Sequence, residues 1–588
     1  MKIKSLLILV LSLVTLTAFG QDGGIKGRVV SRAGRIALGD VKITMTPGGT
    51  TTVSDAQGNF VFENIPAGEY SLQFETPEFE TSNIAVRVGS QMRDINAVIL
   101  VPDTQRQMID DAVFAEFDTE TTDDAQALPT SLSASKDLFN NIASYKFSEM
   151  RFNVRGYDSQ YQDVYMNGIQ LNDAMTGYTP WSLWSGLNDA TRNQEVTSGI
   201  VASDAGLGGI GGTTNIVTSP SQMRQGLRAS LVNGNSMYRF RAMVTYASGH
   251  QDNGWSYAFS VSTRQGGNSY VNGVYYNAFG YFAAVEKQFG QRHRLALTLL
   301  GAPTERGAQQ AATQEAYDLV GNNYYNPNWG WQDGKKRNAR VRNNHEPVVM
   351  LNYTFDISDR SKLDLATSLR FGMNGYSALT WQNGPDPRPD YYRYLPSYFA
   401  LDKNMLGAAW QQVYWQANYQ NIRHFDWDKM YQTNYIQNDP VDEAQYGPGR
   451  RSNYMVEERH TDQLDWNLVA NFSHIFRNNS KIYGGLSLRR NRTEYYSEVK
   501  DLLGGDYWAD IDKFAERDFG SNAIAYQNNL DYYYRHGHAH AAKVGDKYGY
   551  DYYAHVLRTK AWAAYNFNVG GLGVTVGGEV GYASQWRE

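Results

Sequence analysis

The sequence predicts a mainly β protein made of several units, on the strength of three observations. Polar and apolar residues alternate over short runs such as 361–372, the period of a strand with two unlike faces. Gly (55) and Tyr (42) are abundant and charged residues make up only 19%, which suits many strands joined by glycine turns. The 588 residues exceed one compact domain, so two or three units are expected.

The composition also excludes several function classes. A formal net charge of -6 gives no basic footprint for nucleic acid. Cysteine is absent, which rules out a disulfide framework and thiolate chemistry. After residue 20 no apolar run reaches the roughly 18 residues that a transmembrane helix needs, so any contact with a membrane must use strands.

Residues 1–20 have the features of a secretory signal peptide. Lys2 and Lys4 precede an apolar run over residues 6–16, and Ala18 and Gly20 stand at positions -3 and -1 of a cut before Gln21. We therefore expect an exported protein.

Residues 21–101 predict a small antiparallel β-sandwich, because short alternating runs are separated by Gly, Pro and Asn turns. "SDAQGNF" at 54–60 has a faint likeness to a calcium loop, but a hairpin turn is favoured because the later ligands are missing. The unit resembles the carboxypeptidase regulatory-like domain, which implies a transthyretin-like fold without catalysis. The resemblance rests on these residues: Gly27, Val29, Asp55, Gly58, Phe60, Pro66, Gly68 and Tyr70.

Residues 102–127 predict a flexible acidic tether, since they hold eight carboxylates against one Arg and few apolar residues. One short apolar island interrupts the tether, "DDAVF", which consists of Asp110, Asp111, Ala112, Val113 and Phe114.

Residues 221–588 contain eleven probable strands, near 226–233, 238–247, 254–264, 275–288, 292–301, 346–356, 361–372, 462–476, 480–493, 556–568 and 572–583. Their faces differ in polarity. Phe240 and Val244 share a face that excludes Arg239 and Arg241, and in 361–372 the leucines oppose Arg370.

The connections between these strands separate a soluble sandwich from a membrane barrel. Tight turns such as "ISDRS" and "RNNS" alternate with long loops at 302–345, 373–461 and 494–555. Short turns at one end and long loops at the other are typical of an outer-membrane barrel. A lipid-facing Arg at mid-depth costs about 2–4 kcal/mol, so the strand arginines are expected to face a polar lumen.

Residues 128–220 are expected to be an α+β plug that fills this lumen, with short strands and one or two helical pieces. They resemble the plug of the TonB-dependent outer-membrane receptors. The resemblance rests on three motifs: Arg155-Gly156, then Asn167-Gly168, then the glycines Gly208, Gly209, Gly211 and Gly212 followed by Asn215-Ile216-Val217-Thr218. The family usually has Asp-Gly at the second motif and a Gly-Pro before the third, which puts only the subfamily in doubt.

The resemblance implies the function: an outer-membrane receptor that imports a scarce nutrient, with energy from the TonB, ExbB and ExbD complex of the inner membrane. The energising complex would pull a short segment, the TonB box, that can add a strand to a partner. "DDAVF" at 110–114 is the candidate. The protein would sit among the lipids of the outer membrane of a Gram-negative bacterium, need no cofactor and be no enzyme. Siderophore, glycan, peptide and cobalamin all stay open as ligands.

The number of strands disagrees with a complete receptor. Receptors of this family have about 22 strands, whereas eleven are present, so we expect a chain truncated within the barrel. The alternatives are a non-transporting surface binding or assembly protein on the same fold and a secreted soluble enzyme.

The candidates for a metal site are His536, His538 and His540, which alternate along one segment. His555 is a possible fourth ligand.

Overall fold

The computed structural model divides the chain into two compact units, Met1–Met108 and Ile109–Glu588, which we describe separately. The described residues are 23–31, 37–76, 79, 82–89, 91–100, 159–197, 199–233, 238–267, 271–290, 292–358, 360–478, 480–520, 522–569 and 572–588. The signal peptide and the tether predicted from the sequence therefore lie outside the described residues.

The first unit is a β-sandwich, as predicted. One sheet has the order β4-β1-β7 and the other β3-β2-β5-β6. The strands are β1 (Gly23–Ser31), β2 (Lys42–Thr46), β3 (Thr50–Val53), β4 (Asn59–Ile65), β5 (Gly68–Glu75), β6 (Ser82–Val88) and β7 (Met92–Leu100). The sheets enclose a core that includes Ile25, Ile43, Phe60 and Leu72. The expectation of a wholly antiparallel sandwich was wrong in one pair, because β1 and β7 run parallel.

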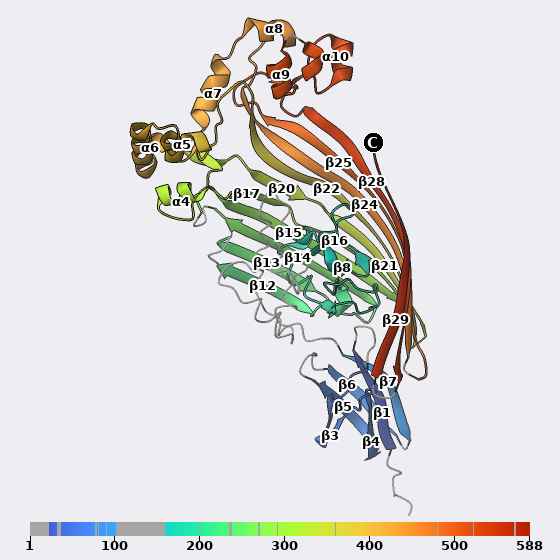
Figure 1. Cartoon of the computed structure of the whole chain (residues 1–588). Helices are drawn as coiled ribbons and strands as arrows, with labels where there is room; N and C mark the ends of the chain where they lie inside the picture. The colour runs from blue at the N-terminus through green and yellow to red at the C-terminus, as the bar shows by residue number, and fades with distance from the viewer. Residues whose placement is uncertain are drawn as a thin grey trace, which may run out of the picture. The chain divides into compact units, whose positions relative to one another are not determined.

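The second unit is built on one sheet of 13 strands (Figure 1). Eleven of them follow one another along an antiparallel path: β12 (Gly226–Asn233), β13 (Phe240–Ala247), β14 (Trp255–Gly266), β15 (Tyr275–Phe289), β16 (His293–Gly301), β21 (Val348–Ser358), β22 (Ser361–Trp381), β24 (Tyr454–Ile475), β25 (Lys481–Asp501), β28 (Lys547–Val569) and β29 (Leu572–Arg587). These are the eleven predicted segments, and four of them are much longer than expected. Among the described strands β12 and β29 end the path, so the sheet is open.

Two short strands, β17 (Thr304–Gly307) and β20 (Val341–His345), complete the sheet by pairing with β15, with each other and with β22. They belong to the first of the three long connections, which the sequence analysis took as loops. The long connections lie at one end of the sheet (Figure 1). The short turns lie at the opposite end, as the alternation of loop lengths predicts.

The long connections, predicted from the sequence only as long loops, are folded. They contain α4 (Gln314–Val320), β18 (Trp329–Gln332), β19 (Lys335–Asn338), α5 (Pro396–Leu401), α6 (Met405–Ala417), β23 (Phe425–Asp426), α7 (Trp427–Ile436), α8 (Pro440–Tyr446), β26 (Trp508–Ala509), α9 (Lys513–Phe519), α10 (Leu530–His536) and β27 (Ala541–Ala542), with 3₁₀ turns η6 (Tyr392–Tyr394), η7 (Tyr419–Asn421) and η8 (Ala523–Tyr526). Side chains cap several of these helices, as Asn404 caps α6 and Asp426 caps α7. Buried aromatic residues such as Trp415 and Trp427 give the connections cores of their own.

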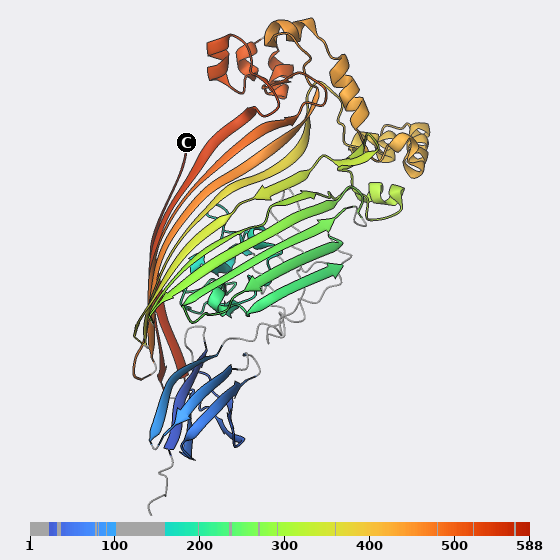
Figure 2. The same cartoon turned by 180° about the vertical axis from the view of Figure 1, so that it is seen from behind.

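Residues 159–222, here called the inner segment, lie against one face of the large sheet (Figures 1 and 2). They form a four-stranded sheet of order β10-β11-β8-β9. The elements are η3 (Ser159–Tyr161), β8 (Asp163–Met166), β9 (Ile169–Gln170), η4 (Trp181–Trp184), β10 (Gln194–Thr197), β11 (Thr213–Ile216) and η5 (Pro220–Gln222).

The inner segment and the large sheet share one hydrophobic core. Met166, Trp184 and Leu187 of the segment belong to the same buried cluster as Phe282 and Met350 of the sheet. The sequence predicted a polar lumen, so that this face of the large sheet, here called the wall, would be polar. That expectation was wrong in part, since Phe282 and Met350 of the wall supply apolar side chains to this core.

The turn at 54–60 of the first unit gives a test of the hairpin interpretation. Asp55 Oδ1 accepts hydrogen bonds from the N–H groups of Gln57 (2.9 Å) and Asn59 (2.8 Å), and Gly58 has a φ of 80°. We predict that Asp55→Ala lowers the unfolding free energy of a fragment of residues 21–101 by about 1 kcal/mol, measured by urea denaturation. Asp55→Asn keeps an acceptor oxygen and should lose less. Equal losses for the two variants would contradict this account.

Candidate functional site

The large sheet exposes an apolar face. Its exposed side chains come from strands along the whole path and include Leu227, Leu231, Val244, Phe259, Val261, Phe279, Leu297, Leu351, Leu369, Leu464, Leu468, Phe472, Leu486, Val576 and Val580. A soluble monomer rarely exposes a continuous apolar surface of this kind. The exposed face is thus suited to contact with lipid.

The length of the apolar stretch on each strand fits the thickness of a bilayer. On β24 it runs from Leu464 to Phe472, and on the neighbouring β22 from Leu363 to Phe371. A membrane strand needs about 9–11 residues to cross the hydrocarbon layer. On β25 the exposed Arg490 follows the apolar stretch directly. The strands therefore continue past the apolar band into a polar region.

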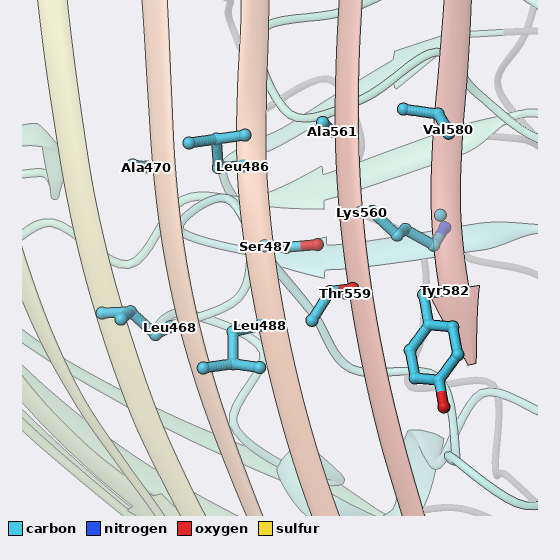
Figure 3. Close-up of a pocket in the computed structure, with 11 residues that line it drawn as sticks. Leu468, Ala470, Leu486, Ser487, Leu488, Thr559, Lys560, Ala561, Val580 and Tyr582 are labelled. Atoms are coloured by element: carbon cyan, nitrogen blue, oxygen red, sulfur yellow. The ribbon is translucent and has the colours of Figure 1, made fainter. Parts of the chain in front are cut away.

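The apolar face is not flat. A hollow of about 580 Å³ is bordered by residues of β24, β25, β28 and β29, and Figure 3 shows these residues as sticks. Aliphatic side chains such as Leu468, Leu486 and Val580 border it, together with the small residues Ala470 and Ala561. The hollow belongs to the same apolar face, and Thr559, Lys560 and Tyr582 also border it.

The opposite face of the sheet is rich in buried charge. Arg489 on β25 makes a bidentate ion pair with Asp465 on β24, at 2.9 and 2.6 Å. Arg370 on β22 pairs with Glu346 at 3.0 Å, and Glu346 also accepts a hydrogen bond from Gln463. Arg370 was predicted to avoid the apolar face, and this prediction is confirmed.

Polar groups on the wall hold the inner segment in place. Arg489 Nη1 donates to the carbonyl of Asn172 at 2.7 Å, and Lys481 pairs with Asp204 at 2.5 Å. Asn352 Nδ2 donates to the carbonyl of Asn167 at 3.1 Å. Between these contacts lies a polar cavity of about 40 Å³, large enough for a water molecule. The contact surface is thus polar in one part and apolar in the part formed by the shared core.

Asp173 of the inner segment responds to the same wall charges. Burial opposes its ionisation, but the positive charge of Arg370 and the hydrogen bonds from Thr176 outweigh burial and hold the pKa of Asp173 below its usual value. The carboxylate therefore stays charged and adds to the attraction between the segment and the wall.

The Asn167-Gly168 motif forms the two-residue turn between β8 and β9. Both residues have positive φ, 49° and 81°, as a type I′ turn requires. The Asn167 side chain accepts from the N–H of Thr218 at 2.9 Å and donates to its hydroxyl at 2.7 Å. Gly168 N–H donates to Asn215 Oδ1 at 3.1 Å. The structure thereby joins the second predicted motif to the end of the third.

The glycines of the third motif permit a close approach of backbones. A Cβ atom on Gly209 would lie 2.4 Å from the carbonyl oxygen of Tyr161, and Gly208 has a φ of 84°. Gly211 N–H donates to the Tyr161 carbonyl at 2.9 Å, and the Gly212 carbonyl accepts from Asp163 N–H at 3.1 Å. These glycines therefore set the start of β8 beside β11.

Other predicted site residues lie elsewhere. Arg155, Gly156 and the candidate TonB box at 110–114 lie outside the described residues. His536, His538 and His540 each contact the ring of Tyr532, with centroids 4.2, 5.8 and 4.8 Å from it. His555 stacks on Trp586 instead. In the described part of the chain no three His, Asp or Glu side chains are grouped as metal ligands.

The buried ion pairs of the wall could not be predicted from the sequence. Polar residues at alternating positions, such as Gln463, Asp465 and Asn467, give a signal that this face of the strand avoids lipid. The pattern does not reveal which charges pair. Within the described ranges, no helix is both long and apolar enough to cross a membrane.

The Arg489 contacts predict a large effect of substitution. Arg489→Met leaves Asp465 buried without its partner and removes the bond to Asn172, so we expect a loss of about 3–5 kcal/mol in unfolding free energy. Denaturation of the full chain in detergent measures it. Arg490→Met, one residue along on the exposed face, is the matched control and should change little. Adding Asp465→Asn to Arg489→Met should recover part of the loss. If the double variant loses as much unfolding free energy as the two single variants together, Arg489 and Asp465 are not coupled.

Comparisons with known proteins match different parts of the chain. Residues 24–99 match the carboxypeptidase regulatory-like domain. The TonB-dependent transporter Oar of Myxococcus xanthus is 34% identical over 100 residues, which are 16% of this chain and 9% of that protein.

Solved structures give matches over a larger share of the chain. The ferric-catecholate import receptor Fiu of E. coli K12 matches with 11% identity and a TM-score of 0.40, over 74% of this chain and 60% of Fiu. The pyoverdine outer membrane receptor FpvA of Pseudomonas aeruginosa PAO1 matches with 12% identity and a TM-score of 0.41, over 72% of this chain and 51% of FpvA. The chain thus spans less than two thirds of the length of each of these relatives. It carries a carboxypeptidase regulatory-like domain at its N-terminal side and is similar to TonB-dependent transporters.

Proposed function

We propose that the chain is an outer-membrane receptor that imports a scarce nutrient, with energy from the TonB, ExbB and ExbD complex. In this proposal residues 1–20 are a signal peptide, 21–101 a periplasmic sandwich and 102–127 a tether. Residues 128–220 are the plug and 221–588 belong to the wall of a membrane barrel. The protein performs no catalysis.

One observation carries the proposal: the large sheet has an exposed apolar face and, on the other face, buried charges that hold a compact segment. Leu468 and Leu486 are exposed on the first face, and Arg489 and Asp465 are buried on the second. A wall with lipid on one side and a polar-anchored filling on the other is what a plugged pore needs. The folded connections at one end are then the outer surface, where ligand-binding residues gather on a rigid scaffold.

A plugged pore also needs an energy source. No nucleotide supply exists at an outer membrane, and ligand binding alone cannot open and reset a plug repeatedly. We therefore assign the TonB box to Asp110, Asp111, Ala112, Val113 and Phe114, ahead of the plug. Siderophore, glycan, peptide and cobalamin are the ligand classes that uptake experiments need to compare.

The assignment of the apolar face to lipid predicts that a charge placed on this face destabilises the protein in a membrane. Leu297 lies on the exposed face of β16 and is 51% exposed. Leu297→Arg should cost about 2–4 kcal/mol of membrane stability, because the charge would enter hydrocarbon. The measurement is the folded fraction in lipid vesicles over a urea series. Leu406→Arg, on an exposed face of α6 outside the sheet, is the control and should have no such effect. Equal effects of both variants would refute the lipid contact.

Deletion of residues 103–118 tests the energised import itself. A strain of the source bacterium that lacks the gene is grown with each nutrient class as the limiting supply, and then complemented with the intact gene or with the deletion. We expect the intact gene to restore growth on one nutrient and the deletion to restore none. Equal restored growth with both genes would refute the TonB-energised import, and growth with neither gene would favour a non-transporting surface binding or assembly protein.

A further inference from the structure

The apolar face of the large sheet carries two arginines without an ionic partner. Arg490 and Arg492 lie two residues apart on β25, on the same face as Leu486 and Leu488, and both are exposed. Within the described residues neither guanidinium makes an ion pair or a hydrogen bond. They are exceptions to the expectation that strand arginines face a polar lumen, so their place on this face needs another explanation.

The carboxylates beyond Arg492 on this face already have partners. Residues that lie opposite one another across neighbouring strands are here called a row. The row beyond Arg492 contains Asp462 of β24 and Glu494 of β25. Asp462 accepts a hydrogen bond from the hydroxyl of Tyr496 at 2.9 Å, and Glu494 pairs with Lys547. The two positive charges on β25 are thus left for an anion outside the protein.

Both arginines stand where the apolar band ends. Arg490 lies opposite Trp466 of β24, and Arg492 lies opposite Leu464 of the same strand. The row of Arg492 ends at Trp586 on β29. Trp466 and Trp586 are exposed, and exposed tryptophans are typical of the interface between a membrane and water. The arginines are therefore at the level where lipid headgroups lie.

The hollow of about 580 Å³ begins in the row next to Arg490. The residues of that row border the hollow from four strands (Figure 3): Leu468, Leu488, Thr559 and Tyr582. A volume of this size is within the range of about 300–1,000 Å³ that is typical of small-molecule sites. Lys560, which also borders the hollow, pairs with Glu579 at 3.1 Å and supplies no free charge. Apolar space and unpaired positive charge are thus side by side.

The spacing of the arginines suits a phosphate group. Residues two apart on a strand have Cα atoms about 7 Å apart, so both long side chains can reach one anion between them. The planar guanidinium group forms two parallel hydrogen bonds to a phosphate, which an ammonium group cannot do. The guanidinium carbon of Arg492 lies 5.1 Å from the ring centre of Tyr553, a contact that supports the side chain and leaves its N–H donors available.

We propose that this part of the sheet binds one molecule of a lipid that carries a phosphate group. An acyl chain lies in the hollow, and the phosphate contacts Arg490 and Arg492. A neutral lipid would leave both charges unpaired, and a soluble phosphate would leave the hollow without an apolar occupant. The proposal rests on the lipid contact that is part of the proposed function, and not on import.

Binding to the full chain in a nonionic detergent tests the proposal without any transport. The probes are dioleoyl phosphatidic acid, dioleoylglycerol, which has the same chains without the phosphate, and glycerol 3-phosphate, which has the phosphate without the chains. Native mass spectrometry over a concentration series measures the fraction of protein that carries one probe molecule. We expect phosphatidic acid to bind at least about tenfold more tightly than either of the other probes.

The other outcomes would overturn the proposal in distinguishable ways. Equal binding of the two lipids would show that the arginines play no part, and would leave the lipid contact of the sheet intact. Equal binding of phosphatidic acid and glycerol 3-phosphate would indicate a site for free phosphate. Absence of phosphatidic acid binding would refute the site altogether. A failed uptake experiment has no bearing on any of these results.

Three substitutions locate the bound lipid. Arg490→Gln and Arg492→Gln should each weaken phosphatidic acid about fivefold and leave dioleoylglycerol unchanged, because each removes one charge. Ala561→Leu fills part of the hollow and should weaken both lipids about fivefold or more, because the space for the chain is lost. Arg477→Gln removes an exposed arginine from the turn after β24, at the other end of the apolar band, and is the control with less than about a twofold change. A loss with Arg477→Gln as large as that with Arg490→Gln, or unchanged binding with Ala561→Leu, would refute the site.

Discussion

The alternation of side chains along a β-strand is the constraint on which the rest of this structure depends. On β25 Leu486 and Leu488 point to one face while Ser487 and Arg489 point to the other. A slip of β25 by one residue against β24 would exchange these two sets, and would bring Arg489 to the apolar face while Asp465 stays behind without its partner. The buried ion pairs and the exposed leucines therefore fix the same register from opposite sides of the sheet. The inner segment can be anchored only because that register holds.

The strands could be predicted from the sequence where their two faces differ in polarity, and their ends could not. On β24 the contrast holds from Leu464 to Phe472, but the strand begins ten residues earlier, at Tyr454. Beyond Arg490 the exposed face of β25 is polar too, so alternation of hydrophobicity no longer marks the strand. Cross-strand hydrogen bonds continue there, and these depend on neighbours that a single segment does not show. The strands were accordingly predicted in the right order, and four of them, β22, β24, β25 and β28, were predicted much too short.

The helices and the anchoring contacts depend on partners distant in sequence. The face of α6 that carries Leu406 and Trp410 is exposed, so the helix lacks the polar outer stripe that marks a surface helix. The Asn167-Gly168 turn could be predicted because both residues tolerate positive φ. The hydrogen bonds of Asn167 to Thr218, 51 residues away, and of Arg489 to Asn172, 317 residues away, could not be predicted. Residue types thus predicted what each segment can do locally, and the fold decided which segments meet.

The two kinds of contact around the inner segment have different consequences for its movement. Each large side chain that left the shared core, such as Met166 or Leu187, would lose about 1.5–3 kcal/mol of burial. The polar contacts are different, because water can replace the hydrogen bonds of Lys481 and Arg489 and already has room beside them in the 40 Å³ cavity. Opening along the polar side, with the apolar core left in place, therefore costs less than expulsion of the whole segment. If the segment is a plug, a pull on its N-terminal side would rearrange the polar contacts first, and the core shared with Phe282 and Met350 would act as the hinge.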